Sequence, residues 1–188
     1  MTPRLKTAHI NGLRLLVHLA SLGFLLWLGY AVPAGLLGGD PVQGLTHYLG
    51  KGALHLLLLT LLVSPLAKRW RQGQVIKLRR PLGLWCCTWA LLHFMVWLGL
   101  DLQFDWGLIG GELVKRSYIV VGALALLLLL ALSITSIPAL LRRMGPAWQK
   151  LHNWIYAVAL LVPMHYWWSV KSGWQEPLIY LLLAMALL

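Results

Sequence analysis

The chain has 188 residues, of which 60% are hydrophobic and only 11% are charged, and its mean hydropathy is positive. This composition excludes a water-soluble domain and indicates an integral membrane protein. The formal net charge of +11 does not indicate a nucleic-acid-binding protein, because the basic residues lie in short loops between apolar segments.

The apolar segments predict six membrane helices along the chain. About 20 residues are needed to cross a hydrocarbon core about 30 Å thick. The last segment has only twelve residues, which reach about 18 Å at helical rise. The sequence thus predicts an all-α integral membrane protein, with residues 1–188 forming a single six-helix domain. The expected spans are Leu13–Val32, Thr46–Leu66, Pro81–Leu100, Tyr118–Ile137, Leu151–Ser169 and Pro177–Leu188.

The distribution of charge predicts the orientation of these helices. Twelve of the sixteen Lys and Arg residues lie in the N-terminal segment, the second loop and the fourth loop. All five acidic residues lie in the alternate loops. Because cytoplasmic loops carry the excess of basic residues, the N-terminus and the even-numbered loops are expected in the cytoplasm. The acidic residues on the opposite side are Asp40, Asp101, Asp105, Glu112 and Glu176.

Two histidines are expected at the same depth on different helices. His93 lies twelve residues into the third expected helix, about 18 Å from its start. His165 lies thirteen residues beyond His152, about 20 Å higher. Histidine inside a membrane is costly without a partner and is a marker of function. Because two neutral imidazoles can bind haem iron axially in a helical bundle, we predict that His93 and His165 hold an outer haem.

A second, inner level contains two further histidines. His152 begins the fifth expected helix, and His18 lies one turn beyond Arg14 in the first. His152 is predicted to be a ligand or a contact of the haem propionates, with His18 as its partner. One geometric objection applies to this level, because thirteen residues of ideal helix place His152 and His165 about 140° apart. Pro163 could kink the helix and re-aim His165.

Other interpretations of the histidines remain open. A single histidine in a helix more often bonds to a backbone carbonyl or to Ser or Thr across the bundle. A zinc or non-haem iron site would need three or four converging ligands, often with a carboxylate, and the apolar spans contain no acidic residue. A transporter or channel whose histidines bind substrate or relay protons is a third, non-redox interpretation.

Four stretches of the sequence resemble a known family. They are HLASLGFLLWL, GGDPVQGLTHYLGKGAL, RRPLGLWCCTWALLHF and WQKLHNWIYAVALLVPMHYWWSVK. The His-x12-His pattern on one helix, with a histidine two helices earlier, is similar to the ferric-reductase-type transmembrane haem domain. Within that group the resemblance is to the MsrQ (YedZ) family, and it covers nearly the whole chain.

The resemblance implies a function. MsrQ proteins lie in the bacterial inner membrane and pass electrons from the quinone pool through b-type haem to MsrP, a periplasmic molybdenum-cofactor enzyme. MsrP reduces methionine sulfoxide in oxidised proteins, so this chain would be its electron-transfer subunit. The resemblance also implies that the chain binds FMN. His93, His152 and His165 occupy the family's haem-associated positions, but larger relatives carry two histidines on the third helix, so one or two haems are expected.

The sequence restricts the electron donor independently of the resemblance. The cytoplasmic segments are short and lack a G-x-G-x-x-G motif after a strand, so the chain has no nicotinamide-binding unit of its own. Electrons must come from a membrane quinol or from a separate flavin reductase. An acceptor other than MsrP, such as ferric iron or oxygen, is the alternative. No FMN motif is present, and the basic second loop could bind either a phosphate or anionic lipid head groups.

Overall fold

The computed structural model describes residues 5–188, and every regular element in this part of the chain is helical. The helices group into two units, whose described residues are 5–101 and 102–188. Arg4, one of the three basic residues of the N-terminal segment, lies outside the described residues.

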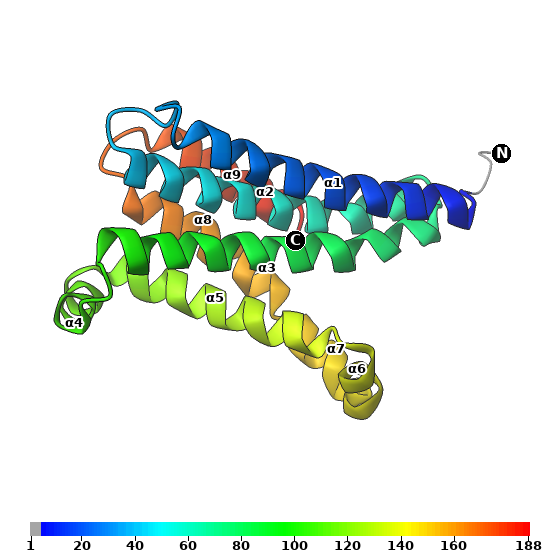
Figure 1. Ribbon diagram of the computed structural model, residues 1–188. Coiled ribbons are helices and arrows are strands. Elements are labelled where there is room, and N and C mark those ends of the chain that lie inside the picture. Colours follow the sequence, from blue (N-terminus) through cyan, green and yellow to red (C-terminus); the bar gives the residue numbers. More distant parts are fainter. Residues whose placement is uncertain (1–4) are drawn as a thin grey trace. The chain divides into compact units, whose positions relative to one another are not determined.

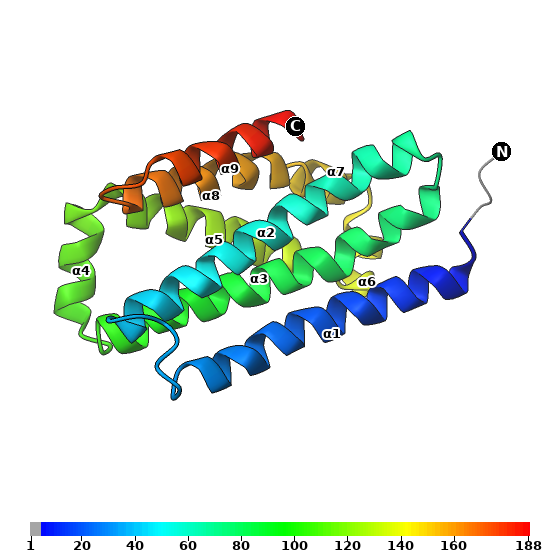
Figure 2. The same ribbon diagram turned by 90° about the horizontal axis from the view of Figure 1, so that it is seen from above.

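The first unit consists of three long helices. They are α1 (Thr7–Ala31), α2 (Pro41–Arg69) and α3 (Arg79–Val96), with the 3-10 helix η1 (Gly73–Leu78) before α3 and the π-helical turn η2 (Trp97–Asp101) after it. Helices α1 and α3 run in one direction and α2 runs in the other (Figures 1 and 2). Asp40 starts α2, because its carboxylate accepts a hydrogen bond from the backbone N–H of Gln43 at 3.0 Å and proline follows it.

Helices α2 and α3 are joined along a buried seam. Leu49 and Ala53 of α2 pack with Trp89 of α3 and with Leu28 of α1. The thiol of Cys86 donates to the carbonyl of Ala53 across the same seam at 3.3 Å. Small residues here let the two backbones approach closely, which is how membrane helices usually associate.

The second unit is built around three helices, with α8 (Ile155–Ser169) between α5 (Ser117–Thr135) and α9 (Gln175–Ala186) (Figure 2). Three shorter helices complete it: α4 (Trp106–Lys115), α6 (Pro138–Met144) and α7 (Pro146–His152). The carboxylate of Asp105 caps α4 by accepting from the backbone N–H groups of Gly107 and Leu108.

Four of the six expected spans are confirmed by length and composition. Among the described residues, the helices long and apolar enough to cross a membrane are Thr7–Ala31, Pro41–Arg69, Gly73–Asp101 and Ser117–Thr135. The last expected span forms the twelve-residue α9, an apolar helix below that length. A six-span arrangement therefore stays a prediction.

The fifth expected span, residues 151–169, is divided. Helix α7 ends at His152, and α8 begins at Ile155. Between them, Trp154 N bonds to Leu151 O at 3.0 Å, and Tyr156 N bonds to Asn153 O at 3.1 Å. These are i→i−3 bonds of a tightened turn. Each overwound residue turns by about 20° more than in an α-helix, which reduces the expected 140° between His152 and His165.

Candidate functional site

His93 is held by the helix that precedes it in the first unit. Its Nδ1 lies 2.9 Å from the carbonyl oxygen of Thr46 on α2. A carbonyl can only accept a hydrogen bond, so Nδ1 carries the proton and the lone pair of the neutral ring is on Nε2. One turn further along α2, a Cβ on Gly50 would lie 3.1 Å from both Nδ1 and Cε1 of His93.

His165 is held in the same way within the second unit. Its Nδ1 lies 2.7 Å from the carbonyl oxygen of Tyr118 on α5. A Cβ on Gly122 would lie 2.7 Å from Nδ1 and Cε1 of the imidazole, closer than real Cβ contacts come. The lone pair of the neutral ring is again on Nε2.

The carbonyl and the glycine are linked by helix geometry. In an α-helix the carbonyl of residue i points towards the N–H of residue i+4, so a ring that reaches this oxygen lies over residue i+4. Only a residue without a side chain leaves room for it, and a carbonyl oxygen has two lone pairs, so the helical bond can remain. Sequence reasoning missed these partners. Their signal is a glycine four residues after the acceptor inside an apolar span, as in T-x3-G from Thr46 and Y-x3-G from Tyr118.

This arrangement fits haem ligation. A metal-binding histidine usually donates its second ring N–H to a carbonyl or carboxylate, which fixes the tautomer and the ring orientation. His93 and His165 both meet that requirement, and the lone pair of each neutral ring is on Nε2. In the part of the chain that the structure describes, no three His, Cys, Asp or Glu side chains converge on a common point.

His152 has the opposite tautomer. The hydroxyl of Thr135 donates to the carbonyl of Ala131 at 2.7 Å and lies 3.1 Å from Nε2 of His152. Because that hydroxyl proton is already used, Nε2 carries the proton and Nδ1 has the lone pair. Trp148 stacks on the imidazole, with ring centroids 3.8 Å apart at 24°, and its indole N–H donates to the carbonyl of Thr135.

His18 is paired with a tryptophan of the same unit. The indole N–H of Trp85 on α3 donates to Nδ1 of His18 at 2.8 Å. The lone pair of His18 is therefore occupied and Nε2 carries the proton. This geometry favours a hydrogen-bonding role for His18 over iron ligation.

Trp89 provides a second sign of a bound group. Its side chain is 4% exposed, and its indole N–H has no hydrogen-bond acceptor among the described residues. The Trp89 ring lies against Gly52, and a Cβ added at that glycine would overlap it. The ring also stacks on Tyr48, with ring centroids 5.9 Å apart. An unsatisfied buried donor costs about 1–3 kcal/mol. A cofactor that presents an oxygen atom here, one helical turn before His93, would remove that cost.

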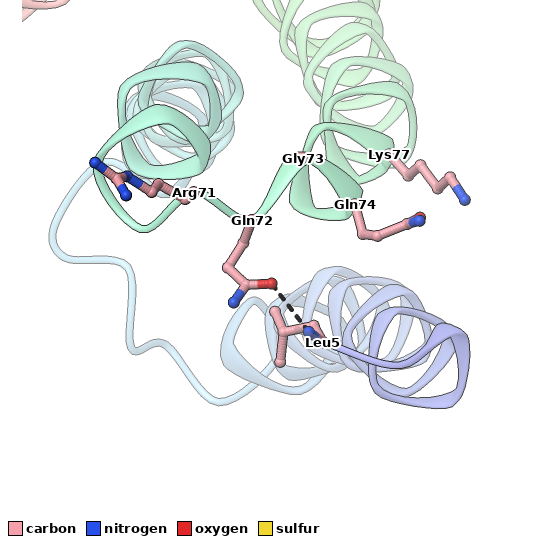
Figure 3. Close-up of a pocket in the computed structure, with 6 residues that line it drawn as sticks. All are labelled: Leu5, Arg71, Gln72, Gly73, Gln74 and Lys77. Atoms are coloured by element: carbon pink, nitrogen blue, oxygen red, sulfur yellow. Dashed lines mark hydrogen bonds between the residues drawn. The ribbon is translucent and has the colours of Figure 1, made fainter. Parts of the chain in front are cut away.

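The basic second loop forms a pocket of about 440 Å³ at the start of α1. Its lining residues are Leu5, Arg71, Gln72, Gly73, Gln74 and Lys77. The side-chain oxygen of Gln72 accepts from the backbone N–H of Leu5 at 2.9 Å. Figure 3 shows Arg71 and Lys77 directed to opposite sides, so the two cations do not converge on one phosphate as arranged here.

Comparison with known proteins places the chain in a family. Residues 49–163 match the family described as "Ferric reductase like transmembrane component". The chain is 47% identical to the protein-methionine-sulfoxide reductase heme-binding subunit MsrQ of Pectobacterium atrosepticum, over 98% of this chain and 94% of that protein. It is 46% identical to the MsrQ of Yersinia pseudotuberculosis, over 98% and 92% of the two chains. No solved structure matches. The chain therefore belongs to the ferric-reductase-like transmembrane family and, within it, to the MsrQ heme-binding subunits.

Proposed function

We propose that the chain carries electrons across the bacterial inner membrane through b-type haem, as the membrane subunit of a methionine-sulfoxide reductase system. The observation that carries this proposal is the pair of histidines, His93 and His165, whose Nδ1 atoms are bonded to backbone carbonyls. The names of the similar proteins support it, since they are heme-binding subunits of protein-methionine-sulfoxide reductases. When bound, haem supplies an iron that alternates between ferric and ferrous states.

The outer haem is assigned to His93 and His165. The proposal rests on their expected common depth and on their shared tautomer, in which the lone pair of the neutral ring is on Nε2. Each of the two units thus presents one imidazole whose orientation is set by a main-chain hydrogen bond. Trp89 provides an indole N–H one helical turn from His93. A ring held by the main chain loses little conformational freedom on ligation, which favours binding.

The inner site is assigned to His152, in either of two roles. As a ligand it would use Nδ1, because Thr135 already accepts from Nε2. As a contact of the haem propionates it would need an N–H directed at the carboxylate, so Nε2 would have to leave Thr135. His18 is assigned to hydrogen bonding, since Trp85 occupies its lone pair.

The proposed route runs from a membrane quinol or a separate flavin reductase to a periplasmic MsrP-type reductase. MsrP then repairs methionine sulfoxide in oxidised periplasmic proteins. FMN, which the family resemblance implies, is proposed as a further cofactor, and the basic second loop, where Arg71 and Lys77 line the pocket, is the place to test for it against anionic lipid head groups. The two cations would have to turn towards each other to hold the phosphate of FMN. FMN content in an Arg71→Ala protein tests this assignment, and unchanged content would exclude the loop.

Spectroscopy and reconstitution test the function. The purified protein should show a Soret band and sharp α-bands when it is reduced, and a quinol should then reduce MsrP only when the chain is present. A protein without haem would support a histidine-lined transporter. Haem that reduces ferric iron or oxygen but not MsrP would support the alternative acceptors.

A further inference from the structure

Within the first unit, His18 lies on an exposed face of α1, where a membrane would place lipid. It is the twelfth residue of the 25-residue α1, and its side chain is exposed. Its neighbours Leu15, Leu19 and Leu22 are 58%, 58% and 46% exposed. A helix of this length and hydropathy can span the bilayer. A polar side chain at this depth is costly unless it finds a partner.

Trp85 determines which nitrogen of His18 faces outward. Its indole N–H can only donate, and it donates to Nδ1 of His18 at 2.8 Å. The neutral ring must then carry its proton on Nε2. No residue of the described part of the chain accepts a hydrogen bond from that N–H. The indole ring lies edge-on to the imidazole, with centroids 6.1 Å apart at 61°. The lipid-facing group is thus an oriented hydrogen-bond donor beside an aromatic surface.

We propose that His18 and Trp85 form a docking site for the head group of a lipid-soluble quinone. The ligand must reach the site through the bilayer, which excludes water-soluble molecules. The ligand must accept a hydrogen bond from Nε2–H of His18. This excludes metal ions and other cations, because they would need the lone pair of a ring nitrogen instead. The ester carbonyl of a phospholipid also accepts a hydrogen bond, but a phospholipid has no flat ring to pack against the indole and the imidazole. A quinone has both a carbonyl acceptor and a flat ring. The inference rests on the proposed electron-transfer function, for which it supplies the place where a lipid-borne donor binds.

Direct binding of decylubiquinone tests the site. The full chain is placed in phosphatidylcholine nanodiscs, and its quinone Kd is compared among three variants. His18→Phe keeps a flat ring but removes the donor, and it should raise Kd by about 3- to 10-fold, the effect of one net hydrogen bond. His18→Gln keeps a side-chain N–H and an acceptor for Trp85, and it should restore binding. Leu22→Phe, on the same exposed face, is the matched control and should leave Kd unchanged.

Haem content is measured on the same samples, so that the two proposals fail separately. Equal Kd values for wild type and His18→Phe would overturn the quinone site and would indicate that lipid occupies this face. No measurable binding to the wild type would overturn it as well. Loss of haem in both His18→Phe and His18→Gln would also overturn it, by assigning His18 to the haem. A wild type without haem would refute the proposed function, while the comparison of quinone Kd values would remain interpretable.

Discussion

His93 and His165 are bound to the main chain at identical sequence intervals. Each Nδ1 reaches a backbone carbonyl 47 residues earlier in the chain, Thr46 O at 2.9 Å and Tyr118 O at 2.7 Å. The glycine that makes room for each ring lies 43 residues before the histidine, at Gly50 and Gly122. The two units therefore orient these two histidines by the same pair of contacts.

Replacement of either histidine should remove the outer haem. In His93→Ala or His165→Ala the iron loses one of its two proposed axial ligands, so low-spin haem should be lost while the protein stays inserted. Haem stoichiometry and spectra of the purified variants measure this. His47→Ala, which removes an exposed histidine next to Thr46, is the control. Full haem and unchanged low-spin spectra in both single variants would show that the pairing is wrong.

The two glycines should be sensitive to a single methyl group, in a definite order. Ala is usually favoured over Gly in a helix by about 1 kcal/mol, so any loss must be steric. Gly122→Ala places Cβ 2.7 Å from the ring of His165, whereas Gly50→Ala places it 3.1 Å from the ring of His93. Overpacking costs about 1–3 kcal/mol. Haem retention under mild denaturant should therefore fall most in Gly122→Ala and less in Gly50→Ala.

Gly23→Ala is the matched control for this series, since a Cβ at Gly23 meets nothing within 4 Å. It should retain haem as the wild type does. If Gly23→Ala lost as much haem as Gly122→Ala, a general effect on the helices would explain the series, and the close approach to His165 would not.

The contact between Thr135 and His152 should tune the inner site. Thr135→Val removes the acceptor of Nε2–H but keeps the side-chain shape. An imidazole that no longer donates is a weaker electron donor to a metal, so the midpoint potential of one haem should rise while haem stoichiometry is kept. His152→Ala should lower the stoichiometry. Redox titration and haem quantification distinguish the two. Unchanged values in both variants would place His152 outside any haem site.

Trp89 should acquire a hydrogen-bond acceptor when the cofactor binds. Its indole N–H is unpaired among the described residues, and its vibration should shift on haem loading. Ultraviolet resonance Raman spectra of apo and loaded protein, with Trp89→Phe to identify the band, measure the change. Trp85 is the internal reference, because it already donates to His18. An identical Trp89 band in both forms would remove this residue from the haem site.

The acidic residues opposite the basic loops are expected to guide the periplasmic partner, as complementary charge mainly speeds encounter. Four of the acidic residues lie in the third and fifth loops, and three of these also have structural roles: Asp105 caps α4, Glu112 pairs with Arg116 at 2.7 Å, and Glu176 accepts from Tyr166. Amide replacements keep a side-chain oxygen for the cap and for the tyrosine. The substitutions to combine are Asp101→Asn, Asp105→Asn, Glu112→Gln and Glu176→Gln.

The combined variant should reduce the partner more slowly at low salt, and its rate should depend less on ionic strength. Its haem spectrum should be unchanged, which separates docking from cofactor loss. The same variant measured at high salt is the control, because screening should make it equal to the wild type. An unchanged rate at low salt would show that docking does not use these charges.

The sequence predicted the long helices because their length and hydropathy are decided locally. It did not predict α4 or α6, which lie in segments expected to be loops, nor the break after His152. That break follows from backbone geometry around Asn153 and Trp154, where i→i−3 bonds replace i→i−4 bonds without a proline or glycine to mark them. His93 and His165 could be identified as candidates from the sequence because they are expected at the same depth on different helices. The hydrogen bonds that set each tautomer depend on which helices pack together, and residue spacing does not show this.

Because the acceptors of His93 and His165 are main-chain oxygens, side-chain replacement cannot delete them. A saturation mutagenesis screen should therefore find that positions 46 and 118 tolerate many side chains. The two positions already carry different ones, Thr46 and Tyr118. Intolerance should appear one helical turn later, at the glycines. A map of sensitive positions alone would thus point to Gly50 and Gly122 and would pass over the atoms that hold the rings.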